Sequence, residues 1–339
     1  MKSKTSKRIY ITVGILLALI IIYFLGPKED FEKVDGIISL SNLDIETLNA
    51  TFDQENASVK NLKPTCGKSI IWHKDSIHKT EYAVVFLHGF SACAFEGNPI
   101  VNDFATAFGC NLYLHRFPQH GQNDNESFKT ITPKMWVESA KEAINIAANI
   151  GEKIIVMSSS TGGTLSSYLA AENPDLIHAQ LLYSPNFKLH NPAAFILNNH
   201  WGLPFLRQLE GGNYHYITDM SAEAMPHWTT TYRIEGLVAL QDLIEQTMTN
   251  ATFKKISSPV FVGYYYKNEE EKDYIVSIDR MKEFYDLIQT PEDKKHIVPF
   301  AEVGGHVITN QYQRGGLEEV RKATFEFAET VLGMRQVRR

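Results

Sequence analysis

The stretch from Lys153 to Tyr168, KIIVMSSSTGGTLSSY, constrains the fold of this chain more than any other part of the sequence. Its apolar run, residues 154–157, predicts a buried strand, and residues 164–172 predict a helix. The residues between them are three serines, a threonine and two glycines, all of which suit a tight turn. The sequence therefore predicts a strand, a tight turn and a helix in direct succession.

Ser160 stands in the middle of this turn, with the small residues Ser158 and Gly162 two positions to either side. Small neighbours let the backbone pass through a crowded turn and hold the Ser160 hydroxyl at the N-terminus of the helix. Unpaired N–H groups there favour negative charge, so the pattern predicts a nucleophilic serine. A serine-rich turn that merely caps a helix is the alternative interpretation, and other parts of the sequence must decide between them.

A second signal follows the apolar run at residues 83–87, which predicts a central parallel strand covered on both faces. The run ends in His88, Gly89 and Phe90. Gly89 allows a sharp turn that can direct the backbone amide of Phe90 into a site. We expect His88 to brace this loop through hydrogen bonds and not to transfer protons.

Strand and helix patterns alternate along most of the chain, and this alternation predicts a doubly wound, mostly parallel sheet with helices on both faces. The predicted strands lie at residues 70–72, 83–87, 111–115, 154–157, 179–183, 258–266 and 296–300. The predicted helices lie at residues 98–108, 133–149, 164–172 and 277–288.

The alternation stops between residues 188 and 254, where prolines, paired glycines and short helical patterns take its place. We interpret this segment as a cap over the active site, inserted between core parts at residues 70–187 and 255–335. Its aromatic residues include Trp201 and Trp228, which we expect to contact an apolar substrate. Packing of the cap onto the core is the alternative role for most of these aromatics.

Two further candidates lie in the second core part. Asp273 stands in the loop after the strand at residues 258–266, close to Glu269, Glu270 and Glu271. His306 follows two glycines after the last strand.

Together these motifs resemble the α/β-hydrolase superfamily over residues 70 to 332, with Ser158 where the commonest form of the serine turn has glycine. The chain most resembles the capped group of carboxylesterases, monoacylglycerol lipases and lysophospholipases, also described as serine aminopeptidase-like. The resemblance implies a triad of Ser160, His306 and Asp273, in which Asp273 orients His306, with Glu269, Glu270 and Glu271 as the alternative acids. It also implies an oxyanion hole formed by the amides of Phe90 and Thr161.

The resemblance further implies hydrolysis of a small-molecule or lipid-like carboxylic ester through an acyl-enzyme, with no metal and no organic cofactor. Two alternatives stay open. A peptidase of the same fold would need acidic cap residues to bind a peptide amino terminus, for which Glu210 and Glu223 are candidates. A non-catalytic binding protein on the same scaffold is the other, although the intact Ser160 and His306 argue against it.

The N-terminus predicts a membrane anchor. Residues 1–8 carry four basic residues and no acid, and residues 9–25 are almost entirely apolar, which is close to the shortest length that spans a bilayer. We favour an uncleaved signal anchor over a cleaved signal peptide. The basic tip would then stay in the cytoplasm, and the catalytic body would lie on the periplasmic or extracellular side. Residues 26–69 would form a stalk and an N-terminal helix.

The charge of the body limits its partners. The chain has a formal net charge of −6, and the four positive charges lie in the N-terminal segment, so the body carries −10. This balance argues against nucleic acid as a partner and against broad electrostatic docking on anionic lipid. The three cysteines lack metal-site spacing. Cys93 and Cys110 are the pair we would expect to form a disulfide in an oxidising compartment, and buried free thiols are the alternative.

Overall fold

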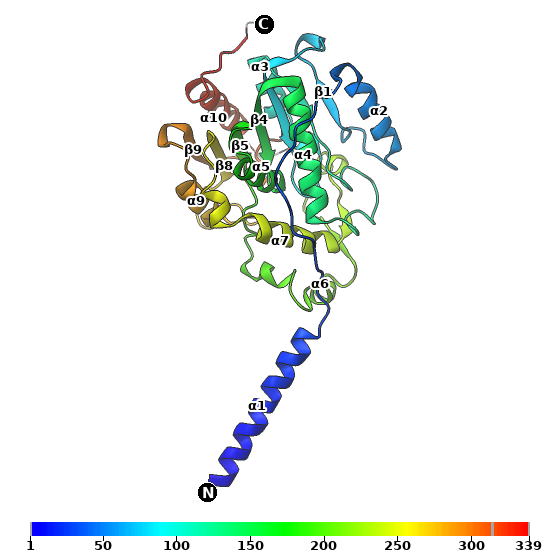
Figure 1. Cartoon of the computed structure of the whole chain (residues 1–339), viewed down its shortest axis with the longest axis vertical. Helices are drawn as coiled ribbons and strands as arrows, with labels where there is room; N and C mark the ends of the chain where they lie inside the picture. The colour runs from blue at the N-terminus through cyan, green and yellow to red at the C-terminus, as the bar shows by residue number, and fades with distance from the viewer. Residues whose placement is uncertain (1, 313–314, 338–339) are drawn as a thin grey trace.

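A computed structural model describes residues 2–312 and 315–337 of the chain. The predicted sheet is confirmed: seven strands lie in the order β1-β3-β2-β4-β5-β8-β9 (Figure 1). β1 runs antiparallel to β3, and all other neighbours are parallel. The strands are β1 (Ser69–Ile71), β2 (Thr80–Leu87), β3 (Asn111–Leu114), β4 (Gly151–Ser159), β5 (Ile177–Tyr183), β8 (Val260–Tyr265) and β9 (Lys295–Phe300).

Helices cover both faces of this sheet, as the alternating pattern predicted. α4 (Pro133–Ile150), α5 (Thr161–Glu172) and α9 (Ile278–Leu287) share one apolar cluster, and α3 (Ile100–Phe108) and α10 (Leu317–Thr330) share the other. Side chains of β2 alternate between the clusters, because successive residues of a strand point to opposite faces. Val85 lies in the first cluster, and Val84 and Phe86 lie in the second.

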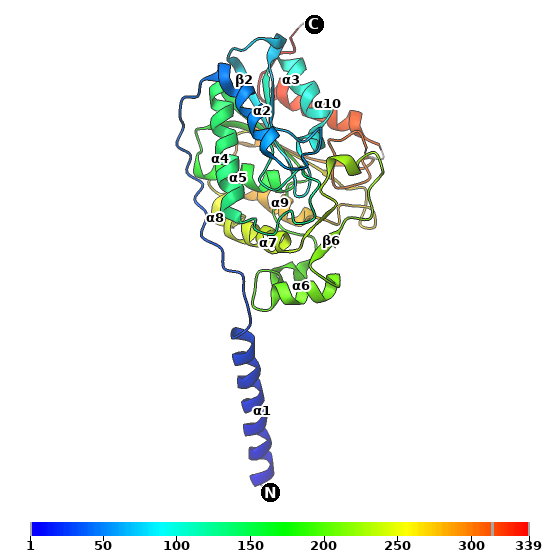
Figure 2. The ribbon, with the colours of Figure 1, turned by 90° about the vertical axis from the view of Figure 1, so that its right-hand side faces the viewer.

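The cap segment, residues 188–254, lies between β5 and β8. It holds α6 (Gly202–Glu210), the strand pair β6 (Tyr214–Tyr216) and β7 (Thr231–Arg233), α7 (Glu235–Thr247) and α8 (Asn250–Phe253). α7 packs on α4 and α5, so it joins the cap to the core. α6 lies at the end of the body nearest the N-terminal helix (Figures 1 and 2).

The N-terminal helix, α1 (Lys2–Phe24), projects away from the body (Figure 1). Its window Lys7–Phe24 has a mean hydropathy of 2.0 and is exposed throughout. By length and composition, this one helix among the described residues could cross a membrane.

The segment after α1, predicted as a stalk and an N-terminal helix, lies against the body. Residues 27–43, which we call the strap, run along the outside of α7, α5 and α4 before the chain enters α2 (Leu48–Ser58) (Figure 2). Three side-chain amides bind the strap: those of Gln246, Asn173 and Asn149. Each amide accepts a bond from one strap N–H and donates to the carbonyl two residues earlier. The sequence does not reveal these contacts, because the amides lie far from the strap along the chain.

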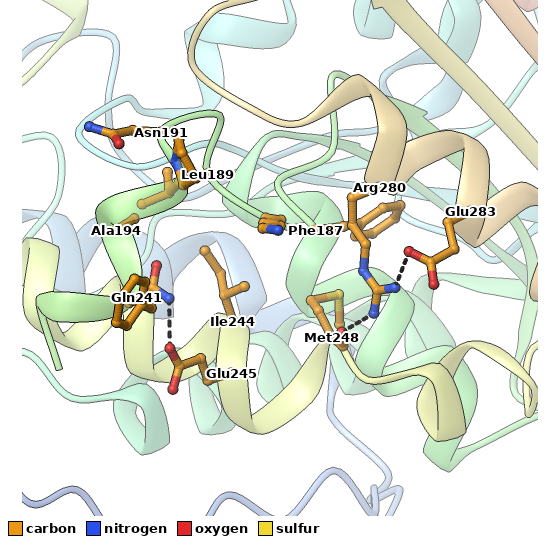
Figure 3. A pocket seen from close by; sticks show the side chains of 13 residues that line it. Phe187, Leu189, Asn191, Ala194, Gln241, Ile244, Glu245, Met248, Arg280 and Glu283 are labelled. Carbon is orange, nitrogen blue, oxygen red and sulfur yellow. Dashed lines mark hydrogen bonds and ion pairs between the residues drawn. The ribbon is translucent and has the colours of Figure 1, made fainter. Parts of the chain in front are cut away.

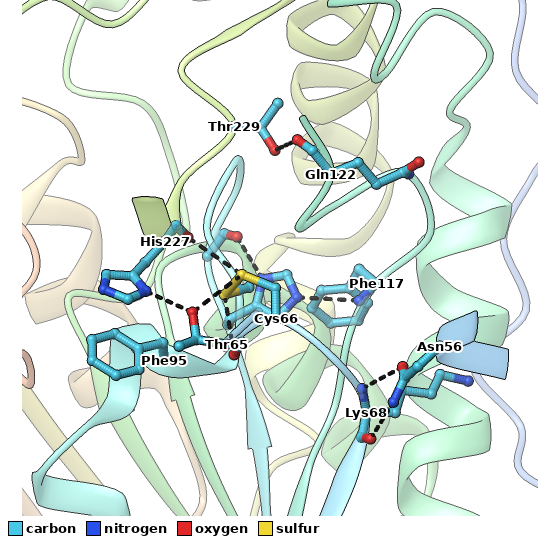
Figure 4. Close-up of a disulfide and its surroundings, with 12 residues drawn as sticks. Asn56, Thr65, Cys66, Lys68, Phe95, Phe117, Gln122, His227 and Thr229 are labelled. Carbon is cyan, nitrogen blue, oxygen red and sulfur yellow. Dashed lines mark hydrogen bonds between the residues drawn. A yellow bond between two sulfur atoms is a disulfide. The ribbon is translucent and has the colours of Figure 1, made fainter. Parts of the chain in front are cut away.

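The expected disulfide is also different. Cys93 pairs with Cys66, with 5.3 Å between the Cα atoms (Figure 4). Cys110 is free and buried. Cys93 follows the carboxyl end of β2, whereas Cys110 directly precedes the amino end of β3. Since β2 and β3 are parallel, α3 carries the chain to the opposite edge of the sheet, and Cys93 and Cys110 cannot meet.

Candidate active site

The predicted serine turn joins β4 directly to α5. Ser160 has φ 50° and ψ −115°, a backbone conformation that is costly for a residue with a side chain. Hydrogen bonds hold this conformation: the Ser160 N–H donates to Tyr183 O, and Asn186 N–H donates to Ser160 O. Gly162 is required, because a Cβ there would lie 1.9 Å from the carbonyl oxygen of Leu87. The turn is therefore a strained one that its surroundings fix in place.

The loop after β2 packs against this turn. A Cβ on Gly89 would lie 3.0 Å from the Cβ of Ser160, so glycine allows the close approach of the two loops. His88 is buried, its Nδ1 donates to Gly89 O, and its Nε2 accepts from Phe117 N. Burial lowers the pKa of His88 to about 4, so the ring stays neutral and braces the loop as predicted. Within the described residues, the backbone N–H groups of Phe90 and Thr161 donate to no protein acceptor.

His306 and Asp273 meet through a hydrogen bond of 2.6 Å from Nδ1 to Oδ2. The other carboxylate oxygen of Asp273 accepts from the N–H groups of Ile275 and Val276. Burial alone would raise the pKa of Asp273, but the charge of His306 and these hydrogen bonds outweigh it and lower the pKa. Burial would likewise lower the pKa of His306, yet the Asp273 pair and the charge of Glu96 raise it.

The second ring nitrogen of His306, Nε2, is buried and has no hydrogen-bond partner among the described residues. A cavity of about 630 Å³ opens on His306 and is lined from both the core and the cap. Trp228 and Asp219 line it from the cap. An imidazole that is fixed at Nδ1 and free at Nε2 can accept a proton on the cavity side.

The remaining predicted residues divide into two groups. Trp228 lines the His306 cavity, whereas Trp201 lies outside it, at the start of α6 beside the end of α1. The alternative acids do not reach His306: Glu269 pairs with Lys272 and Glu271 with Lys267 in an exposed loop. Of the two cap acids considered for peptide binding, Glu210 pairs with His215 and Glu223 is exposed.

Glu96 is a site residue that the sequence analysis missed. It is 2% exposed, and its Oε2 accepts from the backbone N–H of Gly89 at 2.6 Å. Burial raises the pKa of Glu96 to about 7, against the opposing effects of that hydrogen bond and the charge of His306. No pattern around Glu96 separates it from an exposed acid, so only its burial in the fold reveals it.

Glu96 belongs to a short turn, η3 (Ala94–Gly97), that connects the parts of the site. Cys93 of the disulfide caps its start. Its backbone accepts from the side chains of Thr309 and Asn310, which follow His306. The same turn therefore contacts the disulfide, the Gly89 loop and the His306 loop. Phe95 connects this turn to the cap, because its ring stacks on the ring of His227 with 3.8 Å between the ring centroids (Figure 4).

A second cavity, of about 310 Å³, lies between the cap and α9 (Figure 3). Arg280 in its wall is already bonded to Glu283 and to the carbonyl of Met248, and Gln241 donates to Glu245. None of the predicted catalytic residues lines this cavity. The candidate active site is therefore the cavity that His306 lines, although Ser160 and Asp273 are not among its lining residues.

A family model described as "Serine aminopeptidase, S33" (Hydrolase_4) matches residues 78–302, which include Ser160, Asp273 and Glu96. The chain belongs to this family. The Hydrolase_4 match ends four residues before His306, which the structure itself joins to Asp273. Among the described residues, no group of three or more His, Cys, Asp and Glu side chains could hold a metal ion.

Relatives of this Hydrolase_4 chain include the thermostable monoacylglycerol lipase of Bacillus sp. (strain H-257), which is 32% identical over 93 residues. That match covers 27% of this chain and only 36% of the relative. A structure reported for the metagenome-derived lipolytic enzymes LipS and LipT is similar with a TM-score of 0.62 and 15% identity, over 78% of this chain and 98% of that one. The structure of the Paleococcus ferrophilus monoacylglycerol lipase is similar with a TM-score of 0.56 and 15% identity, over 77% of this chain and 96% of that one. At this identity the structural likeness shows a shared α/β-hydrolase fold.

Proposed function

We propose that this protein is a serine hydrolase that cleaves carboxylic esters and is held at a membrane by α1. The observation that carries the proposal is the His306 pair: Nδ1 is bonded to the buried Asp273, and Nε2 is free beside a cavity. An imidazole held in this way is suited to remove a proton from a serine hydroxyl. Ser160 is the proposed serine, because its turn fixes it at the N-terminus of α5.

In the proposed reaction, Ser160 Oγ attacks the ester carbonyl while His306 Nε2 takes its proton. Asp273 keeps the ring in the tautomer that leaves Nε2 free, and it stabilises the imidazolium that forms. The N–H groups of Phe90 and Thr161 would bind the oxyanion of the tetrahedral intermediate. His306 then protonates the leaving alcohol, and water releases the acyl group from Ser160 by the same steps.

The substrate class follows from the cavity and the anchor. The lining of the His306 cavity includes the apolar side chains of Met220, Trp228 and Ile275, which suit an acyl chain, beside polar ones such as Ser221 and Asn310. α1 would hold this cavity beside a bilayer, with the basic tip in the cytoplasm and the body exported. A lipid-like ester of the carboxylesterase, monoacylglycerol lipase or lysophospholipase type is therefore the substrate we propose.

Labelling with a fluorophosphonate probe tests the chemistry. We expect the full chain in detergent to label, and Ser160→Ala and His306→Ala to abolish labelling. Ser158→Ala is the matched control, since Ser158 is buried in the same turn and should label like the wild type. Equal labelling of the wild type and Ser160→Ala would refute the assignment. Extraction of membranes with alkaline carbonate tests the anchor, which predicts that the chain stays in the pellet.

A peptidase activity is the second candidate, because one cap carboxylate, that of Asp219, lines the cavity where a peptide amino group would need a counter-charge. The two candidates separate in one assay. Hydrolysis of p-nitrophenyl esters without hydrolysis of amino-acid p-nitroanilides would support the proposed esterase function. The reverse preference, lost in Asp219→Asn, would support the peptidase.

A further inference from the structure

The cap exposes a group of large apolar side chains at the end of the body nearest α1. Phe195, Trp201, Phe205 and Leu209 are 58%, 42%, 47% and 66% exposed. Phe205 and Leu209 lie four residues apart and therefore share one face of α6. The opposite face is already occupied, since Leu203 and Leu206 pack with Val238 of α7. We call the four exposed side chains the α6 face.

The start of α6 is joined to the end of α1. The indole N–H of Trp201 lies 3.2 and 3.1 Å from the carbonyl oxygens of Ile22 and Tyr23, and the Trp201 backbone N–H donates to Pro27 O. Gly26 makes room for this indole, because a Cβ there would overlap the ring at 1.9 Å. His200 adds a bond of 2.8 Å from Nδ1 to Gly26 O. These contacts of His200 and Trp201 with residues 22–27 connect the end of α1 to the cap, and we call them the joint.

The strap fixes the body behind this joint. The amide bonds of Gln246, Asn173 and Asn149 attach it to three helices in turn. A flexible stalk would let the body rotate above a bilayer. The strap restricts this rotation, because it is bound along the body and its first residue, Pro27, is bonded to Trp201. The orientation of the body relative to α1 is thus set by contacts at both ends of the strap.

These observations place the α6 face at the depth of the membrane surface. The candidate membrane span of α1, Lys7–Phe24, has 18 residues, which at ~1.5 Å per residue is about 27 Å, close to the hydrocarbon core of ~30 Å. Its last turn therefore lies near the headgroups, and Trp201 touches that turn. Tryptophan is enriched at this level because its ring is apolar and its N–H is polar.

We propose that the α6 face rests in the headgroup layer of the phospholipid bilayer that α1 spans, so that the cap is a second membrane contact. This inference rests on the proposed anchor and extends it. The contact is apolar, since the acidic body offers no general attraction to anionic lipid. Ester lipids dissolved in the bilayer would then lie directly beside the cap that covers the active site.

Tryptophan quenching by brominated lipid tests this contact. Trp72, Trp136 and Trp228 are buried, and Trp201 is kept because it forms the joint with α1, so each added tryptophan is compared with the wild type. In full-length Leu209→Trp, the added tryptophan reports from the far end of α6. Ile71→Trp, at an exposed position of β1, is the matched control on the body.

The variants are reconstituted in vesicles of phosphatidylcholine with and without bromine on the acyl chains. We expect the emission added by Leu209→Trp to be lost in brominated lipid and that added by Ile71→Trp to be unaffected. If neither is quenched while the protein floats with the vesicles, the docking is wrong although the anchor holds. Quenching of both would contradict a fixed orientation. A protein that does not float would overturn the anchor and the docking together, and fluorophosphonate labelling would still report on the hydrolase.

A second measurement uses activity. Phe205→Glu with Leu209→Glu places two charges on the α6 face without touching the His306 cavity. We expect hydrolysis of a long-chain ester dissolved in vesicles to fall, and hydrolysis of a water-soluble short-chain ester to stay at the wild-type level. Equal rates on the vesicle substrate would contradict the proposal.

Discussion

Replacement of Glu96 by glutamine should change how stability depends on pH. The pKa of Glu96 is raised from 4.5 to about 7, and this difference corresponds to about 3 kcal/mol. Since the folded state holds the proton more tightly than the unfolded chain, stability from this group is complete below pH 4.5. It is lost as the pH rises through 7. Glutamine keeps an acceptor for the Gly89 N–H but has no proton to lose.

The free energy of unfolding of Glu96→Gln, relative to wild type, should therefore rise by about 3 kcal/mol between pH 4.5 and pH 8. Urea denaturation of the full chain in a nonionic detergent measures it. Glu46→Gln, at an exposed site, controls for the effect of the substitution itself. A difference between Glu96→Gln and wild type that is the same at both pH values would refute the reasoning.

Glu96→Gln also has an effect on activity. The charge of Glu96 is one of the causes that raise the pKa of His306, so its removal should lower that pKa. The acidic limb of the pH profile of kcat/KM, where His306 loses its proton, should then move to lower pH. A purely structural role for Glu96 would change the height of the profile and leave this limb in place.

Three further predictions concern the triad, the strap and the joint. Asp273→Asn should lower kcat for ester hydrolysis by roughly 10⁴-fold with little change in KM, because the wrong His306 tautomer is favoured; a loss of less than tenfold would contradict the assigned role. Asn173→Ala removes two bonds to the strap and should cost about 1–2 kcal/mol of unfolding free energy. It should also speed protease cleavage of the strap, unlike Asn42→Ala at an exposed strap position. Gly26→Ala should disrupt the Trp201 joint and shift Trp201 emission; an unchanged spectrum would count against that contact.

Much of the fold followed from local patterns. The strand patterns at residues 83–87 and 154–157 lie inside β2 and β4, because central parallel strands are continuous apolar runs. The serine turn and the loops of Asp273 and His306 could be found because each follows such a strand. The carboxyl ends of parallel strands lie on one edge of the sheet, so residues far apart in sequence come together there.

The features that sequence reasoning missed depend on packing between distant segments. The Cys66–Cys93 pair requires knowledge of which loop covers the end of β2. The burial of Glu96 depends on how the η3 turn packs. The strap amides of Asn149 and Asn173 read as ordinary polar residues at helix ends. The sequence does not separate Trp201 from the other cap aromatics, although its position beside α1 gives it different neighbours from those of Trp228.

The attached strap also controls how far the protein can reach. Freed from the helices, about 17 residues could extend to roughly 60 Å, and the active site would sample a hemisphere of solution above the bilayer. Bound along α7, α5 and α4, the same residues would hold the cap at a single height above the bilayer that we propose α1 spans. The substrate concentration that the proposed enzyme meets would then be the concentration of ester within the lipid layer itself. Turnover would follow the mole fraction of substrate in the membrane and not its amount per volume of water.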